Sequence, residues 1–195
     1  MTQSDQAAER ERIMTAAYDL LAASGGTAVS VTDILAKAGL STRAFYRHFD
    51  SRDGLLTAMF RRDSDRVVAT LRTRADAAPT GRAALETWLT ETLALADDPR
   101  RRRRAVVLNS QEVSRARGYH VEQDHYRALH EGALARILER GRQDRTLPRA
   151  RPQADAAHIG AALHQALAHQ MSGNSTSPAA DVAGSLIDFV IRALT

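Results

Sequence analysis

The stretch SVTDILAKAGLSTRAFYRHFD, residues 30–50, decides the fold. Ser30 and Ser41 are both favourable N-cap residues, and Asp33 lies three positions after the first of them, where a carboxylate supports the start of a helix. Gly39 is the residue type that ends helices in a left-handed conformation. The stretch therefore predicts two short helices joined by a tight turn at Gly39, which is a helix-turn-helix pattern.

The second short helix has one apolar face and one cationic face. At about 100° per residue, Phe49 lies about 40° from Phe45, so the two rings form a stripe that we expect to be buried. Arg43 and Arg47 lie about 160° and 200° from Phe45, on the opposite face. Two like charges at this spacing are mutually unfavourable in an isolated helix. This pattern favours an anionic partner for the outward face.

Three further groups flank these arginines. Tyr46 and His48 lie on either side of them, and Arg52 follows at the predicted start of the next helix. An anionic, groove-shaped partner such as DNA accounts for all of these groups, because arginines bind base edges and phosphates. The alternative is that the arginines are solvated surface residues and that Tyr46 and His48 are packing residues. The capped helix-turn-helix favours DNA.

The composition agrees with a globular helical protein. The chain has 195 residues, of which 44% are hydrophobic and 26% are charged, which argues against a disordered chain. Aromatic residues make up only 5%, and the 11 glycines and 5 prolines are too few for a loop-rich β protein. Helical periodicity continues to the C-terminus, and we predict an all-α fold of about nine helices. Before the helix-turn-helix, a helix is expected from Ile13 to Leu21. After it, helices are expected to begin after Ser51 and after the turn at residues 78–81, and a further one to run from the arginines at 100–104 to about Arg117. The last three are expected around residues 126–138, 154–171 and 180–194.

The charge and the cysteine count narrow the function. The formal net charge is +4, and Lys37 is the only lysine among 27 basic residues. Arginine suits phosphates and guanine edges, although so modest an excess indicates an anionic partner only weakly. The absence of cysteine excludes disulfides, thiolate zinc sites and cysteine nucleophiles. The polar N-terminus and the lack of long apolar stretches predict a cytoplasmic protein without a signal peptide or membrane span.

Residues 13–56 resemble the N-terminal domain of TetR-family transcriptional regulators. The resemblance rests on four segments, which are residues 16–21 (AAYDLL), 34–41 (ILAKAGLS), 45–49 (FYRHF) and 51–56 (SRDGLL). It covers about a quarter of the chain. It implies a DNA-binding domain over residues 1–54 and a helical ligand-binding and dimerisation domain over residues 55–195.

The resemblance also implies a set of DNA contacts. Ser30 and Thr32 would contact phosphates, Thr42 and Arg43 would read bases in the major groove, and Tyr46, His48 and Arg52 would hold further phosphates. The complete implied set is Ser30, Thr32, Ser41, Thr42, Arg43, Tyr46, Arg47, His48 and Arg52. Many family members have glycine at the position of Arg43, so the longer arginine side chain is expected to reach toward a guanine. Many also have an aromatic residue at the position of Arg47, where this chain departs from the family pattern.

The family resemblance further implies a homodimer. Its last two helices pair with those of a second copy in a four-helix bundle, and two recognition helices about 34 Å apart predict a palindromic operator. The candidate interface residues are Ala162, Ala166, Leu186, Phe189 and Val190. An intrachain core explains these residues equally well.

A small-molecule effector would bind among the middle helices. The candidate pocket residues are Met59, Phe60, Trp88, Leu108 and Tyr126, and core packing explains each of them at least as well. The resulting interpretation is a ligand-responsive dimeric repressor that is not an enzyme and has no cofactor. The alternative is a helical module that sequesters ligands or binds proteins without binding DNA.

Two further patterns bear on function. Three histidines, His120, His125 and His130, follow one another at intervals of five residues. On a helix this spacing places successive rings about 140° apart, which disfavours binding of one metal ion within that helix. A histidine/carboxylate metal or enzyme site assembled between helices stays open. No catalytic sequence motif is present. The arginine run 100–104 fits a solvated helix start better than a contact with DNA or an acidic face.

Overall fold

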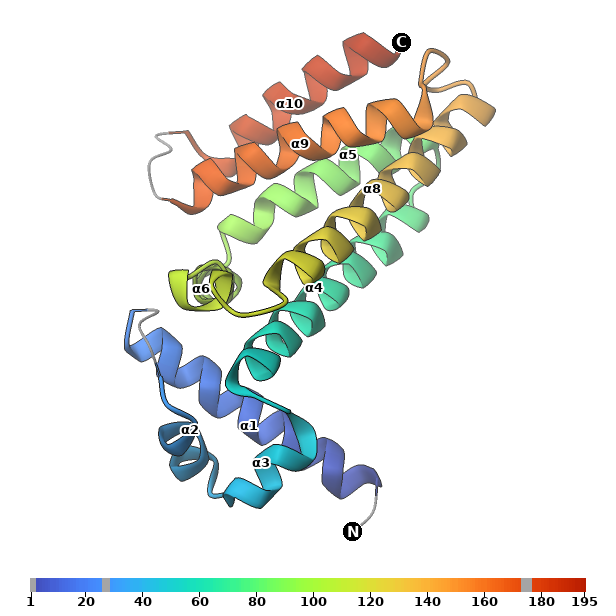
Figure 1. Ribbon diagram of the computed structural model, residues 1–195. Helices are drawn as coiled ribbons and strands as arrows, with labels where there is room; N and C mark the ends of the chain where they lie inside the picture. The colour runs from blue at the N-terminus through green and yellow to red at the C-terminus, as the bar shows by residue number, and fades with distance from the viewer. Residues whose placement is uncertain (1–2, 26–28, 173–176) are drawn as a thin grey trace. The chain divides into compact units, whose positions relative to one another are not determined.

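The computed structural model describes residues 3–25, 29–172 and 177–195 (Figure 1). Within these ranges the chain forms ten α-helices and one 3₁₀ helix and contains no strand, which confirms the predicted all-α class. The elements are α1 (Gln3–Ala23), α2 (Val31–Ala38), α3 (Thr42–His48), α4 (Arg52–Asp76), α5 (Gly81–Leu93), η1 (Ala94–Ala96), α6 (Pro99–Leu108), α7 (Gln111–Ser114), α8 (Tyr119–Gln143), α9 (Pro152–Met171) and α10 (Ala179–Leu194).

The chain divides into two compact units. Unit 1 consists of residues 1–63 and 103–123, and unit 2 consists of residues 64–102 and 124–195. Helices α4, α6 and α8 each contribute residues to both units. A segment from the middle of the sequence is therefore part of the same compact unit as the helix-turn-helix.

The predicted helix signals of residues 30–50 are confirmed. The Ser30 hydroxyl accepts a hydrogen bond from the Asp33 amide at 3.1 Å, and the Ser41 hydroxyl accepts one from the Ala44 amide at 3.3 Å. Gly39 ends α2 with a φ of 62°, the left-handed conformation that glycine adopts without strain. The sequence also predicts a helix stop at Gly25 and Gly26. Helix α1 ends just before this pair, at Ala23, and Gly26 lies outside the described residues.

Phe49 occupies a different backbone position from the one predicted. It follows α3 in an extended conformation, with φ −143° and ψ 128°, instead of continuing the helix. Its ring nevertheless lies 5.6 Å from that of Phe45, and the two residues are 4% and 0% exposed. The predicted apolar anchor of α3 is therefore present although its second ring comes from the residue after the helix.

The helix predicted from the arginine run to about Arg117 is divided in two. Helix α6 ends at Leu108. Ser110 then adopts an extended conformation, and its hydroxyl accepts a hydrogen bond from the Val113 amide at the start of α7. At the other end of α6, the Asp98 carboxylate accepts hydrogen bonds from the amides of Arg100 and Arg101 at 2.8 and 3.2 Å. A carboxylate at the positive helix end offsets the unfavourable position of the arginines.

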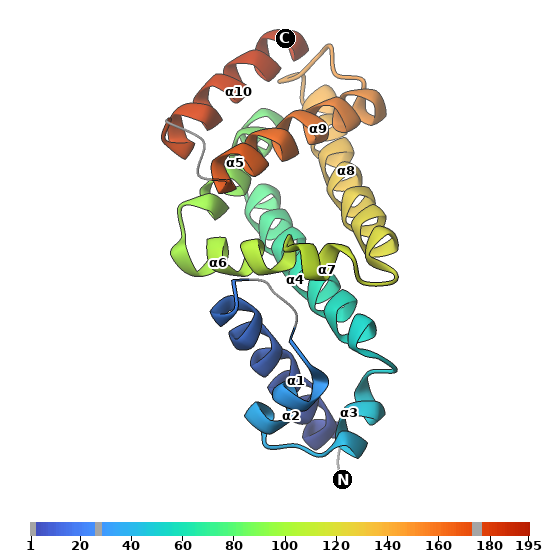
Figure 2. The ribbon, with the colours of Figure 1, turned by 60° about the vertical axis from the view of Figure 1, so that its left-hand side comes forward.

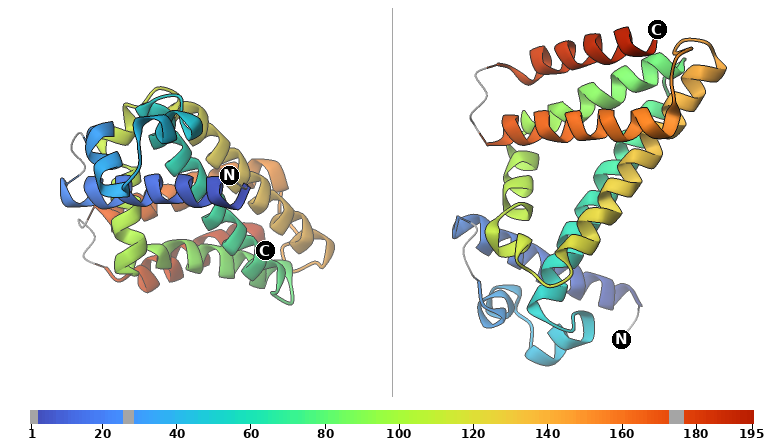
Figure 3. Two further views of the ribbon diagram at one scale, coloured as in Figure 1. Left: turned by 90° about the horizontal axis from the view of Figure 1, so that it is seen from below. Right: turned by 45° about the horizontal axis from the view of Figure 1, so that its top comes forward.

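Unit 2 is a bundle of helices. Helices α5, α9 and α10 lie side by side with the parts of α4 and α8 that belong to this unit, and α9 and α10 run antiparallel (Figures 1 and 3). Trp88, Leu89 and Leu93 of α5 are fully buried at its centre, with Leu134 of α8 and Leu163 of α9. No helix in the described ranges combines the length and the apolar character needed to cross a membrane.

Candidate nucleic-acid interface

In unit 1, helices α1, α2 and α3 pack together around a common core (Figure 2). Buried side chains from all three helices and the start of α4 form this core, including Ile13, Leu21, Ile34, Phe45 and Leu55. The end of α2 is also held from α1, because the Arg12 guanidinium donates to the Ala38 carbonyl at 2.6 Å. Helix α3 is thereby fixed on its inner side.

The residues predicted to contact DNA lie mainly on the outer surface of unit 1. Seven of the nine are exposed, and His48 and Arg52 are half-buried. Tyr46 is 61% exposed although it is a large aromatic residue, and its ring meets the buried Phe45 ring edge-on at 5.4 Å. Arg43 is exposed one turn earlier on α3. This surface therefore combines cationic side chains with the hydroxyl of Tyr46, whose ring packs against Phe45.

Glu9 of α1 holds the far end of α3. One oxygen of its carboxylate lies 3.0 Å from Nη1 of Arg47 and 3.0 Å from Nε2 of His48. The His48 side chain is only 7% exposed, whereas that of Arg47 is 33% exposed. Glu9 therefore competes with any phosphate for the same two groups, and no pattern in the sequence marks this carboxylate.

Arg52 begins α4 and is engaged within unit 1. Its Nε donates to the Val29 carbonyl at 2.7 Å, and its guanidinium forms an ion pair with Glu112 of α7. Next to it, the Asp53 carboxylate accepts a hydrogen bond from the Arg117 amide at 3.0 Å. The segment around α7 is thus attached to the residues that lead into and follow the helix-turn-helix.

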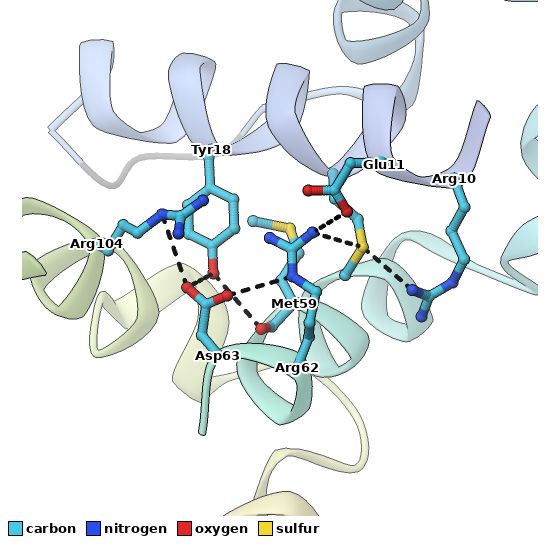
Figure 4. Close-up of polar contacts among 8 residues, drawn as sticks. Arg10, Glu11, Tyr18, Met59, Arg62, Asp63 and Arg104 are labelled. Atoms are coloured by element: carbon cyan, nitrogen blue, oxygen red, sulfur yellow. Dashed lines mark hydrogen bonds and ion pairs between the residues drawn. The ribbon is translucent and has the colours of Figure 1, made fainter. Parts of the chain in front are cut away.

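A buried polar cluster joins α1, α4 and α6 in unit 1 (Figure 4). The Tyr18 hydroxyl donates to the Asp63 carboxylate at 2.8 Å, and Asp63 also lies 3.3 Å from Nε of Arg62 and 3.8 Å from Nε of Arg104. Arg62 reaches Glu11 of α1 at 2.6 Å. Burial, together with the charge of Asp63, raises the pKa of the Tyr18 phenol, so Tyr18 acts as a donor.

Arg104 gives part of the arginine run a structural role. Its guanidinium lies 5.0 Å above the Tyr18 ring in addition to facing Asp63. The preceding residues 100–103 are exposed, and Arg101 pairs with Asp98 at 3.4 Å. Sequence reasoning missed Glu9, Asp63 and Tyr18 as polar partners because each contact joins helices that are distant in the sequence, and no local pattern marks it.

The predicted pocket residues are divided between the two units. Met59, Phe60 and Leu108 belong to unit 1, and Phe60 packs edge-on against Tyr119 at 5.1 Å. Trp88 and Tyr126 belong to unit 2, where both lie close to His130. Within the described ranges no three histidine, aspartate or glutamate side chains come together as metal ligands.

The predicted dimer residues differ in exposure. Ala162 and Phe189 are exposed, the latter at 62%, and Ala166 and Leu186 are half-buried. Val190 is 3% exposed and belongs to the core of unit 2. On α10 a surface groove is lined by Ser177, Asp181, Val182, Ser185, Leu186, Phe189 and Arg192.

Residues 13–59 match the family model described as bacterial regulatory proteins, tetR family. Among curated proteins, none matches the sequence. Several solved structures share the fold over nearly the whole chain. FadR from Bacillus subtilis, solved in complex with stearoyl-CoA, has 14% sequence identity and a TM-score of 0.76, and the alignment covers 95% of this chain and 99% of that one.

Two regulators from other organisms give similar results. The TetR-family regulator PfmR from Thermus thermophilus is 24% identical with a TM-score of 0.67, covering 95% of this chain and 97% of its own. NalD, the secondary repressor of the MexAB-OprM multidrug efflux pump in Pseudomonas aeruginosa, is 19% identical with a TM-score of 0.69, covering 99% and 98%.

The family model matches the N-terminal part of the chain, and the solved structures show the fold that the whole chain shares with them. The chain carries the TetR-family N-terminal domain and has the fold of TetR-family transcriptional regulators. The resemblance of residues 13–56 to the N-terminal domain of TetR-family regulators is confirmed. Regulators of this family bind DNA and are not enzymes.

Proposed function

We propose that this protein is a dimeric, ligand-responsive transcriptional repressor that binds a palindromic operator through α2 and α3. The observation that carries the proposal is the outer surface of α3, where Arg43 and Tyr46 are exposed while Phe45 anchors the helix from beneath. A rigidly held helix with cations on its free face suits the major groove.

In this proposal some surface residues contact bases and others contact phosphates. Thr42 and Arg43 read base edges, and Ser30, Thr32, Ser41 and Tyr46 contact phosphates, which position the helix without reading sequence. Arg47, His48 and Arg52 contact phosphates only in competition with Glu9 and Glu112, their present partners. Residues 1–54 form the DNA-binding domain, and residues 55–195 form the ligand-binding and dimerisation domain.

The second copy binds through α9 and α10. The exposed ring of Phe189, with Leu186 on the same groove, supports an interface on α10, since a large exposed apolar residue indicates a contact surface. Ala162 and Ala166 permit a close approach of α9 to the other copy. Val190 supports this interface from the core of its own chain instead of contacting the partner.

Release from DNA follows from a population shift. Without effector, the dimer holds its two α3 helices at operator spacing, about 34 Å or a small multiple of it. An effector that binds unit 2 favours a second state, and it releases DNA only in proportion to its differential affinity for the two states. Helix α4 is common to both units and provides a covalent path between them.

Selection of bound sequences from a random DNA pool tests this function. Enrichment of a palindrome at a stated salt concentration supports the proposal. If purified protein at low ionic strength prefers no double-stranded sequence, the alternative is correct, and the chain sequesters ligands or binds proteins without DNA.

Substitutions of two arginines test the division of roles on the selected operator. Arg43→Ala should cost roughly 1–3 kcal/mol of binding free energy and relax one base preference. Arg52→Ala should weaken binding to all sequences and flatten the dependence of affinity on salt. Equal behaviour of the two variants across sequences would show that the division of roles is wrong.

A further inference from the structure

A cluster of aromatic rings from three helices lies inside unit 2. Trp88 comes from α5, Tyr126 and His130 from α8, and His164 from α9. The His130 ring centroid lies 4.9 Å from that of Trp88, 5.6 Å from that of Tyr126 and 4.9 Å from that of His164. His130 is therefore at the centre, with three rings around it. We call these four residues the imidazole cluster.

The imidazole cluster contains polar atoms without partners. Trp88 and His130 are both 0% exposed. Within the described part of the chain, Nε1 of Trp88, both ring nitrogens of His130 and Nε2 of His164 make no hydrogen bond. Buried polar groups are normally paired, so an imidazole with two unpaired nitrogens requires an explanation. A core that served packing alone would place an apolar ring at position 130.

The unpaired atoms define which chemical group would satisfy them. Burial is the main reason that the pKa of His130 falls to about 3, and the pKa of His164 is also lowered, so both rings are neutral. A neutral imidazole offers one donor and one acceptor, and the indole offers a donor. A hydroxyl group both donates and accepts.

The walls of the imidazole cluster indicate the rest of the ligand. Trp88, Tyr126, His130 and His164 present aromatic faces and edges, which stack favourably with another flat ring. Trp88 also borders a cavity of about 40 Å³ that is lined by apolar side chains such as Ala84 and by the charged side chains of Arg72, Asp76, Arg136 and Arg140. That volume is too small for an aromatic ring, so the Trp88 indole must move for a ring to enter from this cavity.

We propose that the imidazole cluster is the effector site and that it binds a hydroxylated aromatic compound, whose hydroxyl group bonds to His130 and Trp88 while its ring stacks among the four side chains. This inference rests on the proposed ligand-responsive function and adds the chemical class of the ligand. The unpaired nitrogens are then retained for recognition, since an apolar ring at position 130 would avoid their desolvation.

Phenol and toluene form a matched pair of probes, because toluene has nearly the same shape and lacks the hydroxyl group. Trp88 is the only tryptophan, so its fluorescence reports on this site alone when it is excited where phenol does not absorb. We expect phenol to change the fluorescence of the full-length protein saturably, with an affinity at least about tenfold above that of toluene.

Two variants separate recognition from packing. His130→Phe should weaken phenol binding at least about tenfold and should raise the melting temperature of the ligand-free protein, because it removes two unpaired polar atoms. His158→Phe, at an exposed position of α9, should leave the affinity unchanged. If His130→Phe fails to fold, His164→Leu takes its place with the same expected loss of phenol binding.

Several results would overturn the inference. These are the absence of a saturable response to phenol, equal affinities for phenol and toluene, or unchanged binding by the folded cluster variants. Nitrogen-15 spectra of the histidines that stay constant on phenol addition would show that only ordered water satisfies the cluster. Operator binding without phenol is measured separately, so a protein that binds DNA but not phenol refutes this inference alone, and one that binds phenol but not DNA refutes the proposed repressor.

Discussion

Two buried polar groups, Asp63 in unit 1 and His130 in unit 2, have opposite surroundings. In unit 1, Asp63 has a hydroxyl donor from Tyr18 at 2.8 Å and two guanidinium neighbours, one of them Arg62 at 3.3 Å. In unit 2, His130 is fully buried and neither of its ring nitrogens has a partner among the described residues. A satisfied group contributes stability, whereas an unsatisfied one costs stability and is retained for another reason.

This difference follows from the residue types that each unit brings together. The Tyr18 cluster of unit 1 combines carboxylates with guanidinium groups, which pair over a range of geometries with charge-assisted hydrogen bonds. The imidazole cluster combines neutral rings in contact with one another. Rings that stack or meet edge-on gain dispersion energy. In this cluster the ring nitrogens of His130 nevertheless form no hydrogen bond with the described residues. Replacing the central polar residue is therefore expected to lower the stability in the Tyr18 cluster and to raise it in the imidazole cluster.

Removal of the Asp63 carboxylate should have the largest effect on stability. Asp63→Ala leaves the Tyr18 hydroxyl and the half-buried Arg62 without their shared acceptor, and we expect a loss of about 3 kcal/mol in the free energy of unfolding, measured with urea. Asp65→Ala is the matched control on α4, because Asp65 forms an exposed pair with His125 at 3.2 Å and should cost less than about 1 kcal/mol. Equal losses would show that burial of Asp63 does not matter.

The imidazole cluster should make stability depend on pH. Because burial lowers the pKa of His130 from 6.5 to about 3, the unfolded chain binds a proton at a higher pH than the folded one. The stability is fully present above pH 6.5 and declines as the pH falls toward about 3. Between about pH 7 and about pH 5 the loss is about 2 kcal/mol.

The His130→Phe variant isolates this contribution. We expect the difference in unfolding free energy between the variant and the natural protein to grow by the same amount, about 2 kcal/mol, as the pH falls over that range. Titrating groups that do not interact with His130 cancel in this difference, whereas His164, which lies against it, does not. If the difference is independent of pH, His130 has the same pKa in the folded and unfolded chains, and the cluster is wetter than its burial indicates.

The contrast between the clusters also explains how much the sequence predicted. The caps at Ser30 and Ser41 and the stop at Gly39 were predicted correctly because each signal acts over three or four residues. The anchor formed by Phe45 and Phe49 was predicted by helical periodicity, although the helix ends before Phe49. Local chemistry and one-dimensional periodicity are thus sufficient for the helix-turn-helix.

The polar clusters could not be predicted in the same way. The histidine spacing disfavoured chelation within one helix, but it gave no indication that His130 would meet His164 from a different helix. Likewise Tyr18 and Asp63 are 45 residues apart in the sequence. Such contacts depend on how helices pack, and no short-range signal records that packing.

A smaller effect is expected from the guanidinium at the edge of the Tyr18 cluster. Arg104 lies 3.8 Å from the Asp63 carboxylate, but its side chain is 49% exposed, so solvent screens the pair. Arg104→Ala should therefore cost only about 0.5 kcal/mol of unfolding free energy. Arg102→Ala, at an exposed position of the same arginine run, should have no measurable effect. A larger loss for Arg104 would show that its position above the Tyr18 ring contributes more than the ion pair.

A small effect on stability, with a clear effect on DNA binding, is expected from Glu9→Gln. Glu9 lies on the surface side of unit 1, where its carboxylate pairs with Arg47 and His48. Its removal should change the unfolding free energy by less than about 1 kcal/mol, because the pair with Arg47 is partly exposed. It should also free both groups for phosphates and raise operator affinity about threefold at low salt, with a smaller gain at high salt.

Glu11→Gln provides the control for this substitution. It removes the same charge from the same helix, but Glu11 pairs with Arg62, which is not among the predicted DNA contacts. An equal gain in affinity for the two variants would mean that only the net charge of α1 matters. A gain confined to Glu9→Gln would show that this carboxylate restrains the DNA-binding surface, so that even the satisfied ion pairs of unit 1 include one whose loss favours function.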